Sequence, residues 1–275
     1  MDLATIIGLV AGLGVVVTAM VMEKGNPADM LKNPAALVLT IGGAIAATTV
    51  SFPLKTLLAL PTMFIKAMNT NKEAATEAID LLVKMADKAR REGLLTLEED
   101  ARKIEDPFLQ RGVMMVVDGL DPAQVRAILS TEVKHMEERH EEGIGFLNAC
   151  GGFAPTMGII GTVQGLITVL AGLGGDPGAL GEKIGAAFLA TLWGILTANL
   201  IWLPLSGKLR YKSAEEVGYR HLLIEGIMSL QAGENPRVLR EKLYGFLPPK
   251  ARQADDKKAA PAAAAAGAAN AEAEA

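Results

Sequence analysis

The fold is decided by Cys150-Gly-Gly-Phe-Ala-Pro-Thr-Met-Gly-Ile-Ile-Gly-Thr-Val-Gln-Gly-Leu-Ile-Thr-Val-Leu-Ala-Gly-Leu-Gly-Gly175, a stretch without a charged residue. No charge occurs between Glu142 and Asp176, which exceeds the roughly 20 apolar residues that a helix needs to cross a bilayer. The stretch therefore predicts a membrane-spanning helix.

One side of this predicted helix is small and weakly polar. Pro155, Gly158, Thr162 and Gly165 follow at steps of three, four and three residues, so they share a face. Small residues let another backbone come close, and hydroxyls can hydrogen-bond across a helix interface. Because proline lacks an N–H, it also frees a carbonyl, which at membrane depth needs protein or a wet cavity. The face is therefore turned to a partner or an ion pathway, or else serves packing alone.

Three further uncharged stretches are long enough to span a membrane: Leu3–Met22, Ala35–Leu54 and Ile184–Gly207. The last of them repeats the small face and also ends near a proline. That repetition favours a functional face over packing alone. The residues concerned are Ala187, Thr191, Gly194, Ala198 and Pro204.

The remaining segments show helical spacing and no useful strand alternation. In residues 55–145, a helix from Glu73 is expected to stop at Gly93, and Thr96 with Glu99 fits a capping box. Asp121-Pro122 predicts the start of a helix that runs to about Glu142. Residues 208–249 predict a helix to Gln231 and a last short helix from Pro236 to Leu247; the Ala-rich tail, 250–275, is expected to be disordered.

We therefore predict an all-α, polytopic membrane protein with four transmembrane helices and a large helical cytoplasmic segment. Residues 1–54 hold the first two spans and residues 146–207 the other two. Positive charge flanks the spans on the side of the large segment, which places that segment and both termini in the cytoplasm. The flanking residues are Lys55, Lys66, Arg139, Lys208, Arg210 and Lys212.

Composition and motifs narrow the function classes. The 275 residues are 50% hydrophobic with a net charge of −4, which argues against a soluble domain and a nucleic-acid partner. A single cysteine, Cys150, excludes an internal disulfide and a multi-cysteine metal site. His135 and His140 are five residues apart and do not share a helix face, so no metal site is expected. No nucleophile–base pair suggests an enzyme, and no cofactor is expected.

The four predicted spans contain no Asp, Glu, Lys, Arg or His, the groups that mark ion pathways inside membranes. If the protein conducts an ion, another subunit must supply the carboxylate. The small faces of the third and fourth spans would then receive that subunit's helix.

Charges of both signs flank the turn at Gly93. Lys88, Arg90 and Arg91 precede it, and Glu98 and Glu99 follow it. Such an elbow is suited to a transient protein contact. The alternative is a solvated face with local ion pairs.

Several motifs together resemble the MotA/PomA family of flagellar motor stator subunits over about residues 1–249. The carriers are Met1-Asp-Leu-Ala-Thr, Ala89-Arg-Arg-Glu-Gly-Leu-Leu-Thr-Leu-Glu98, Met136-Glu-Glu-Arg-His140, Ala154-Pro-Thr-Met-Gly-Ile-Ile-Gly-Thr162, Ala190-Thr-Leu-Trp-Gly194 and Gly233-Glu-Asn-Pro-Arg237.

The resemblance implies a homo-oligomeric ring, five subunits in the family, around two copies of MotB or PomB in the bacterial inner membrane. The MotB aspartate would supply the missing carboxylate, and the elbow would push on the rotor protein FliG. By motif match, Arg90 and Glu98 are rotor-facing charges, with Arg91 and Glu99 beside them. The expected ion-pathway or partner-helix residues are Pro155, Gly158, Thr162, Ala190, Thr191 and Pro204, among which the prolines couple ion passage to movement and Thr191 adjoins the MotB aspartate.

The likeness around Phe188-Leu-Ala-Thr-Leu-Trp193 is nearer to proton-type members, so we expect protons, with sodium as the alternative. An ExbB/TolQ-type energising subunit is a rival interpretation, although that family resembles a three-span layout. A membrane scaffold without ion flow is the other.

Overall fold

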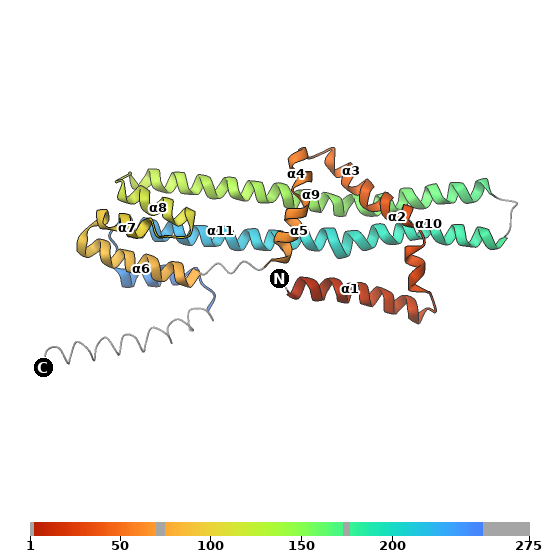
Figure 1. The fold of residues 1–275 in the computed structure, drawn as a ribbon, viewed down its shortest axis with the longest axis horizontal. Helices are drawn as coiled ribbons and strands as arrows, with labels where there is room; N and C mark the ends of the chain where they lie inside the picture. The colour runs from red at the N-terminus through yellow and green to blue at the C-terminus, as the bar shows by residue number, and fades with distance from the viewer. Residues whose placement is uncertain (1–2, 70–74, 173–176, 250–275) are drawn as a thin grey trace. The chain divides into compact units, whose positions relative to one another are not determined.

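The computed structural model describes residues 3–69, 75–172 and 177–249, and within these ranges every regular element is a helix (Figure 1). The all-helical prediction is thereby confirmed. The predicted tail, 250–275, and the predicted helix start at Glu73 lie outside the described residues. Two compact units form, one from Met1–Asn71 with Glu137–Ala214 and the other from Lys72–Met136 with Glu215–Ala275.

The first unit begins with α1 (Leu3–Met22) and a short 3-10 helix, η1 (Pro27–Leu31). None of the residues of α1 is buried, although the helix is strongly apolar. An apolar helix that covers little of its own protein fits contact with lipid. It comes near Leu200 at Gly12, where an added Cβ would lie 2.8 Å from Leu200 Cδ2.

The predicted second span is shorter than the sequence suggested. It consists of α2 (Pro34–Leu37), a π-helical turn η2 (Val38–Gly42) and α3 (Gly43–Thr49), so the boundary at Leu54 was wrong. The helix stops because a residue before proline, here Phe52, avoids the helical region. The chain then restarts as α4 (Leu54–Leu58) and α5 (Leu60–Met68).

Three helical segments of the described chain are long and apolar enough to cross a membrane: Leu3–Met22, Pro122–Ala171 and Leu180–Gln231. Pro34–Thr49 is apolar but reaches only about 24 Å, less than the roughly 30 Å of hydrocarbon. The count of four spans therefore stays a prediction.

The third span does not begin a new helix. One helix, α9, runs from Pro122 to Ala171 with Pro155 inside it, so the predicted stop near Glu142 was wrong. Gly143 and Gly145 look like helix breakers, but both are packing positions. An added Cβ at Gly143 would lie 2.9 Å from Met63 Cε, and one at Gly145 would lie 3.6 Å from the Phe52 ring.

The fourth span is likewise part of a longer helical run. It comprises α10 (Pro177–Thr197), a π-helical turn η4 (Ala198–Trp202) and α11 (Leu203–Gln231). The π turn ends two residues before Pro204. Because proline has no N–H, Pro204 cannot donate to the Leu200 carbonyl four residues earlier. A π turn is one of the usual local adjustments of a helix hydrogen-bond ladder.

The second unit has a larger apolar core. It contains α6 (Ala75–Glu92), η3 (Leu94–Leu97), α7 (Glu98–Ala101), α8 (Pro107–Val117) and α12 (Pro236–Tyr244), with parts of α9 and α11. Each fully buried leucine or isoleucine of this core stabilises the folded state by about 1.5–3 kcal/mol relative to an exposed side chain. Its completely buried members include Ile79, Leu82, Leu97, Leu129, Leu223, Ile227 and Leu230.

Local start and stop signals in this unit are mostly confirmed. Gly93 ends α6 with a φ of 91°, which favours glycine. Asp121 accepts from the Ala123 N–H at 2.9 Å before α9, and Asn235 caps α12 in the same way. The capping box was wrong, because the Thr96 hydroxyl donates to the Gly93 carbonyl at 2.7 Å and α7 has no side-chain cap.

A clamp at Asp106 holds α8 to α11. The carboxylate caps α8 through the N–H groups of Phe108 and Leu109, at 2.8 and 3.2 Å. It also accepts two hydrogen bonds from Arg220 Nη1, at 2.9 and 2.8 Å. Both side chains are mostly buried, so these charge-assisted bonds are each worth about 1.5–3 kcal/mol.

Candidate functional site: a small-residue seam and a charged elbow

The small faces of α9 and α10 meet each other within one chain; we call this contact the seam. At Gly158 an added Cβ would lie 2.8 Å from the Ala190 carbonyl oxygen and 3.3 Å from Gly194 Cα. At Gly165 it would lie 2.5 Å from Ala187 Cβ. Glycine is required at these positions because the opposing atoms are mostly backbone, which cannot move aside.

Two hydroxyls cross the seam. Thr162 Oγ1 and Thr191 Oγ1 are 2.5 Å apart. Thr162 Oγ1 also lies 3.1 Å from the carbonyl oxygens of both Gly158 in α9 and Ala187 in α10, so its hydroxyl can donate to either helix. This one side chain therefore bridges the two helices. Hydrogen bonds of this kind stabilise membrane helix pairs by about 0.6–2 kcal/mol.

The structure brings five of the six predicted ion-pathway residues to the seam or beside it. Gly158 and Ala190 are buried, whereas Pro155, Thr162 and Thr191 are half-buried. Pro204 is exposed and lies apart, beyond the π turn. The packing alternative thus accounts for the glycines, and a partner-facing role for the half-exposed residues stays a prediction.

The sequence did not predict two hydrogen bonds that hold α10 to the segment before α2. Trp193 Nε1 donates to the Met30 carbonyl at 2.9 Å, and Asn33 Nδ2 donates to the Ala186 carbonyl at 2.9 Å. These two bonds tie η1 and the start of α2 to α10. The only signal in the sequence was the indole N–H of Trp193 within an apolar span, and this signal does not identify the acceptor.

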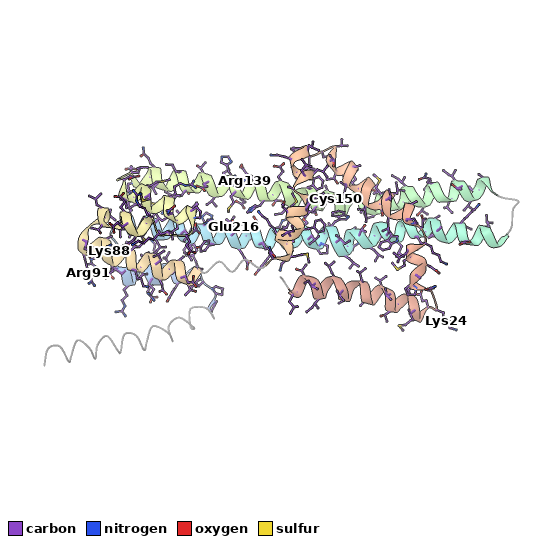
Figure 2. All side chains as sticks on the ribbon, in the orientation of Figure 1. Lys24, Lys88, Arg91, Arg139, Cys150 and Glu216 are labelled. Carbon is purple, nitrogen blue, oxygen red and sulfur yellow. The ribbon has the colours of Figure 1, made fainter. Side chains whose placement is uncertain are left out.

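The core beside the seam is compact and contains Cys150, which Figure 2 labels on α9. The thiol is buried among Ala44, Phe146, Ala154 and Trp202. This burial fits a small packing residue.

The charged elbow lies in the second unit, where α6 ends and α7 begins; Figure 2 marks Lys88 and Arg91 on the last turns of α6. Two of its four predicted charges are paired locally. Arg91 lies 3.0 Å from Asp87 one turn earlier, and Glu98 lies 2.8 Å from Arg102 one turn later. Arg90 and Glu99 are exposed and form no ion pair within the described ranges.

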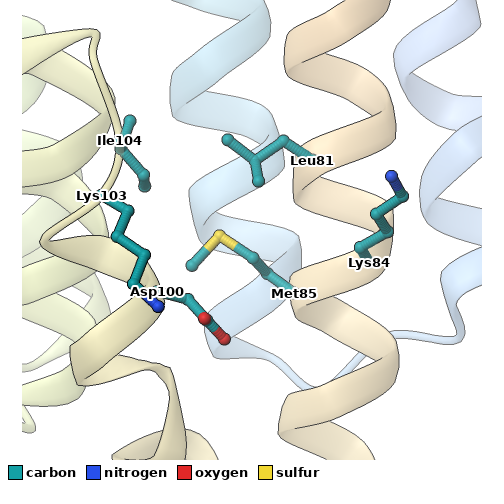
Figure 3. A pocket seen from close by; sticks show the side chains of 6 residues that line it. All are labelled: Leu81, Lys84, Met85, Asp100, Lys103 and Ile104. Atoms are coloured by element: carbon teal, nitrogen blue, oxygen red, sulfur yellow. The ribbon is translucent and has the colours of Figure 1, made fainter.

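A third ion pair closes the elbow. Lys88 Nζ lies 2.7 Å from Asp100 Oδ2 and so joins α6 to α7. This hydrogen bond lowers the pKa of the Asp100 carboxyl and raises the pKa of the Lys88 amine. Beside Asp100 is an open hollow of about 320 Å³ (Figure 3), lined by Leu81, Lys84, Met85, Asp100, Lys103 and Ile104.

Among the described residues, neither place pairs a nucleophile with a base. The seam has hydroxyls but no titratable group. The elbow has charges but no paired nucleophile and base. Among the described residues, no three His, Cys, Asp or Glu side chains gather as a metal site. The geometry fits helix packing in a membrane on one side and an electrostatic protein contact on the other.

Comparison with known proteins agrees with both parts. A family model described as the MotA/TolQ/ExbB proton channel family matches residues 100–221, and one described as Motility protein A N-terminal matches residues 6–93. Motility protein A of Bacillus subtilis (strain 168) is 39% identical over 253 residues, which cover 92% of this chain and 93% of the relative. Chemotaxis protein PomA of Vibrio alginolyticus is 35% identical and covers 90% of this chain and 96% of its own length.

Solved structures show the same fold. A chain of C. jejuni MotAB matches with a TM-score of 0.86 and 30% identity, covering 90% of this chain and 97% of that one. A chain of the flagellar MotAB stator complex from Bacillus subtilis matches with a TM-score of 0.84 and 39% identity over the same shares. The chain therefore belongs to the motility protein A family.

Proposed function

We propose that this chain is the ring-forming subunit of a flagellar motor stator and that it works with a MotB-type subunit to convert an ion gradient into rotation. Membership of the motility protein A family and the likeness to solved MotAB chains support it. The observation that carries the mechanism is the absence of Asp, Glu, Lys, Arg and His from the four apolar stretches.

That absence assigns the ion-binding step to the partner. An ion crossing a bilayer needs a group that carries or binds charge at membrane depth. The seam offers only neutral oxygens, at Thr162 and Thr191. A partner carboxylate that docks near these hydroxyls would be neutralised by the ion, and the chain would supply the surrounding wall. A ring of five such chains, as in the family, would enclose the partner helices.

The expected ion is the proton. A sodium ion needs several oxygen ligands to replace its hydration shell, whereas a proton needs only the carboxylate and a water path. Ala190 has no hydroxyl where sodium-type relatives tend to carry one, which leaves Thr162 and Thr191 as the hydroxyls here.

The proposal also specifies how the chain is oriented in the membrane and which second partner it contacts. Basic residues cluster where α9 and α11 leave the apolar region, so these ends and both termini lie in the cytoplasm of a bacterium, with the spans in its inner membrane. The elbow would then meet a rotor protein of the FliG type. Pro155 and Pro204 would couple ion passage to movement of the ring. The chain would bind no cofactor and act as no enzyme.

The test is motility of a deletion strain that carries the gene on a plasmid. We expect swimming to be lost on deletion and restored by the plasmid, to be insensitive to sodium concentration, and to stop with a proton uncoupler. Normal swimming without the gene would overturn the stator function. Speed that rises with sodium and survives the uncoupler would overturn only the choice of ion.

A further inference from the structure

Helices α4 and α5 form a strap across two long helices; the strap is residues 54–68. At one end Thr56 Oγ1 donates to Glu142 Oε1 at 2.5 Å, and Lys55 Nζ lies 3.3 Å from Glu142 Oε2. At the other end Lys212 Nζ donates to the Lys66 carbonyl at 2.5 Å and to the Asn69 carbonyl. The strap is therefore tied to α9 and to α11, and Figure 1 shows it running across both.

The strap crosses at the level where the apolar segments end. Glu142 is the last charged residue before the uncharged stretch of α9, and Lys208 is the first after that of α10 and α11. A helix that crosses spanning helices at this level runs along the membrane surface. Its inner side packs on the core of the first unit through Leu57, Leu60, Met63, Phe64 and Ala67.

The outer side of the strap is also apolar, which water does not explain. Leu54, Leu58 and Ile65 are 64%, 72% and 58% exposed. Steps of four and seven residues put them on one side of the strap. A helix with apolar residues outward at this level fits the boundary between headgroups and acyl chains.

An exposed lysine lies on the strap, and an exposed tyrosine lies next in sequence to the lysine that holds it. Lys66 is exposed and forms no ion pair among residues 3–69, 75–172 and 177–249. Tyr211, 60% exposed, precedes the Lys212 that holds the strap, and tyrosine is enriched at membrane interfaces. Lysine beside an interfacial apolar stripe attracts anionic lipid.

We propose that the strap is a binding surface for anionic phospholipid. Leu54, Leu58 and Ile65 insert among the acyl chains just below the headgroups, and Lys66 contacts a headgroup phosphate. A second copy of the chain could also cover an apolar stripe, but it would have to bring a carboxylate to Lys66. The proposal goes beyond the stator function and depends only on membrane insertion, so its failure leaves the proposed function standing.

The experiment uses the full-length complex in phosphatidylcholine vesicles, with Leu58→Cys carrying a fluorescent label. Cys150 is buried, so the label goes to the exposed position. One set of vesicles contains brominated phosphatidylglycerol, and another contains the same fraction of brominated phosphatidylcholine. Bromine quenches a nearby label, so we expect the anionic lipid to quench about fivefold more efficiently, as one lysine near a headgroup would produce.

Two variants make the result specific. Lys66→Gln should abolish the preference while leaving quenching by phosphatidylcholine intact, whereas Lys84→Gln on α6 should change neither. A label at Leu95→Cys, in the charged elbow, should be quenched by neither lipid. Equal quenching by both lipids at position 58 would overturn the headgroup contact. No quenching by either lipid would overturn the proposal, and a disulfide formed on oxidation of the unlabelled Leu58→Cys variant would show that a second copy covers the strap instead.

Discussion

The seam and the elbow are built from different kinds of residue: the seam from small uncharged side chains and the elbow from exposed charged ones. The seam joins two helices through glycine, alanine and one hydroxyl pair, and it brings backbone atoms nearly into contact. The elbow presents exposed charges around one glycine turn, and most of its pairs form within a helix or between neighbouring helices. The seam therefore depends on volume and the elbow on charge. A methyl group is a large change in one place and a small change in the other.

This difference follows from the two surroundings. In lipid there is little hydrophobic gain from bringing helices together, so close packing and hydrogen bonds must hold them. At an exposed protein surface, charge steers an encounter over a distance while each ion pair adds little stability. Variants that exchange volume for charge can break or sharpen the comparison.

The largest effect is expected from Gly194→Ala. The added Cβ would lie 2.6 Å from the Ala154 carbonyl oxygen and 3.1 Å from Gly158 Cα, so α10 must move away from α9. Overpacking of this kind costs about 1–3 kcal/mol. Both tryptophans of the chain, Trp193 and Trp202, lie in α10 and η4, so the intrinsic fluorescence of the detergent-solubilised complex reports its unfolding midpoint.

Gly152→Ala on α9 is the matched control, because nothing lies within 4 Å of its added Cβ. It should keep or raise the midpoint, since alanine is favoured over glycine in a helix. Equal midpoints for the two variants would show that the seam is not tightly packed.

An intermediate effect is expected from Arg90→Glu in the elbow. Arg90 has no ion-pair partner within the described ranges, so its charge is available to the proposed rotor contact. Reversal should slow recruitment of fluorescently tagged complexes to running motors about tenfold, because steering changes sign. The folding of the complex should not change.

Arg91→Glu is the comparison for that prediction. Arg91 lies 3.0 Å from Asp87, so part of its charge is already compensated and its reversal should slow recruitment less. If Arg91 proved the more sensitive position, the elbow would present a different side to the rotor. Recruitment that is normal in both variants would remove the elbow from the contact.

Local signals in the sequence predicted much of the fold. Gly93, Asp121-Pro122 and Asn235-Pro236 act within a few residues of the chain, and the structure shows each of them. The continuous helix α9 was not predictable in this way. Gly143, Gly145 and Pro155 each suggest a break locally, yet α9 runs through all three, and the two glycines lie against Met63 and Phe52.

The candidate sites divide along the same line. Spacing alone put Gly158, Thr162 and Thr191 on small faces, but it could not show that the two faces meet within one chain. The elbow was visible as a charge pattern, whereas the pairing of Glu98 with Arg102 was not. The strap was not predicted, because only Leu54 was assigned to the second span and residues 55–68 were assigned to the large helical cytoplasmic segment.

The smallest effect is expected from the pH dependence of the elbow. Hydrogen bonding to Lys88 lowers the pKa of Asp100 below its ordinary value of 3.8, against a smaller opposing effect of burial. Its stabilising contribution is therefore present above about pH 4 and is lost as the pH falls through the folded pKa. The pKa of Lys88 is raised above 10.5, so its contribution is present at neutral pH and is lost only at strongly alkaline pH.

Asp100→Asn should therefore speed amide hydrogen exchange in η3 and α7 at neutral pH. The increase should be only about twofold, because both side chains are about one-third exposed, at 35% and 36%, and water screens the pair. After correction for the intrinsic pH dependence of exchange, the difference from the unmodified chain should stay constant across neutral pH. It should vanish in acid, where Asp100 itself becomes neutral, and Glu99→Gln should not reproduce it. Slower exchange in Asp100→Asn than in the unmodified chain at neutral pH would mean that the Asp100 carboxylate destabilises the turn, and the elbow would then be held together by packing, as the seam is.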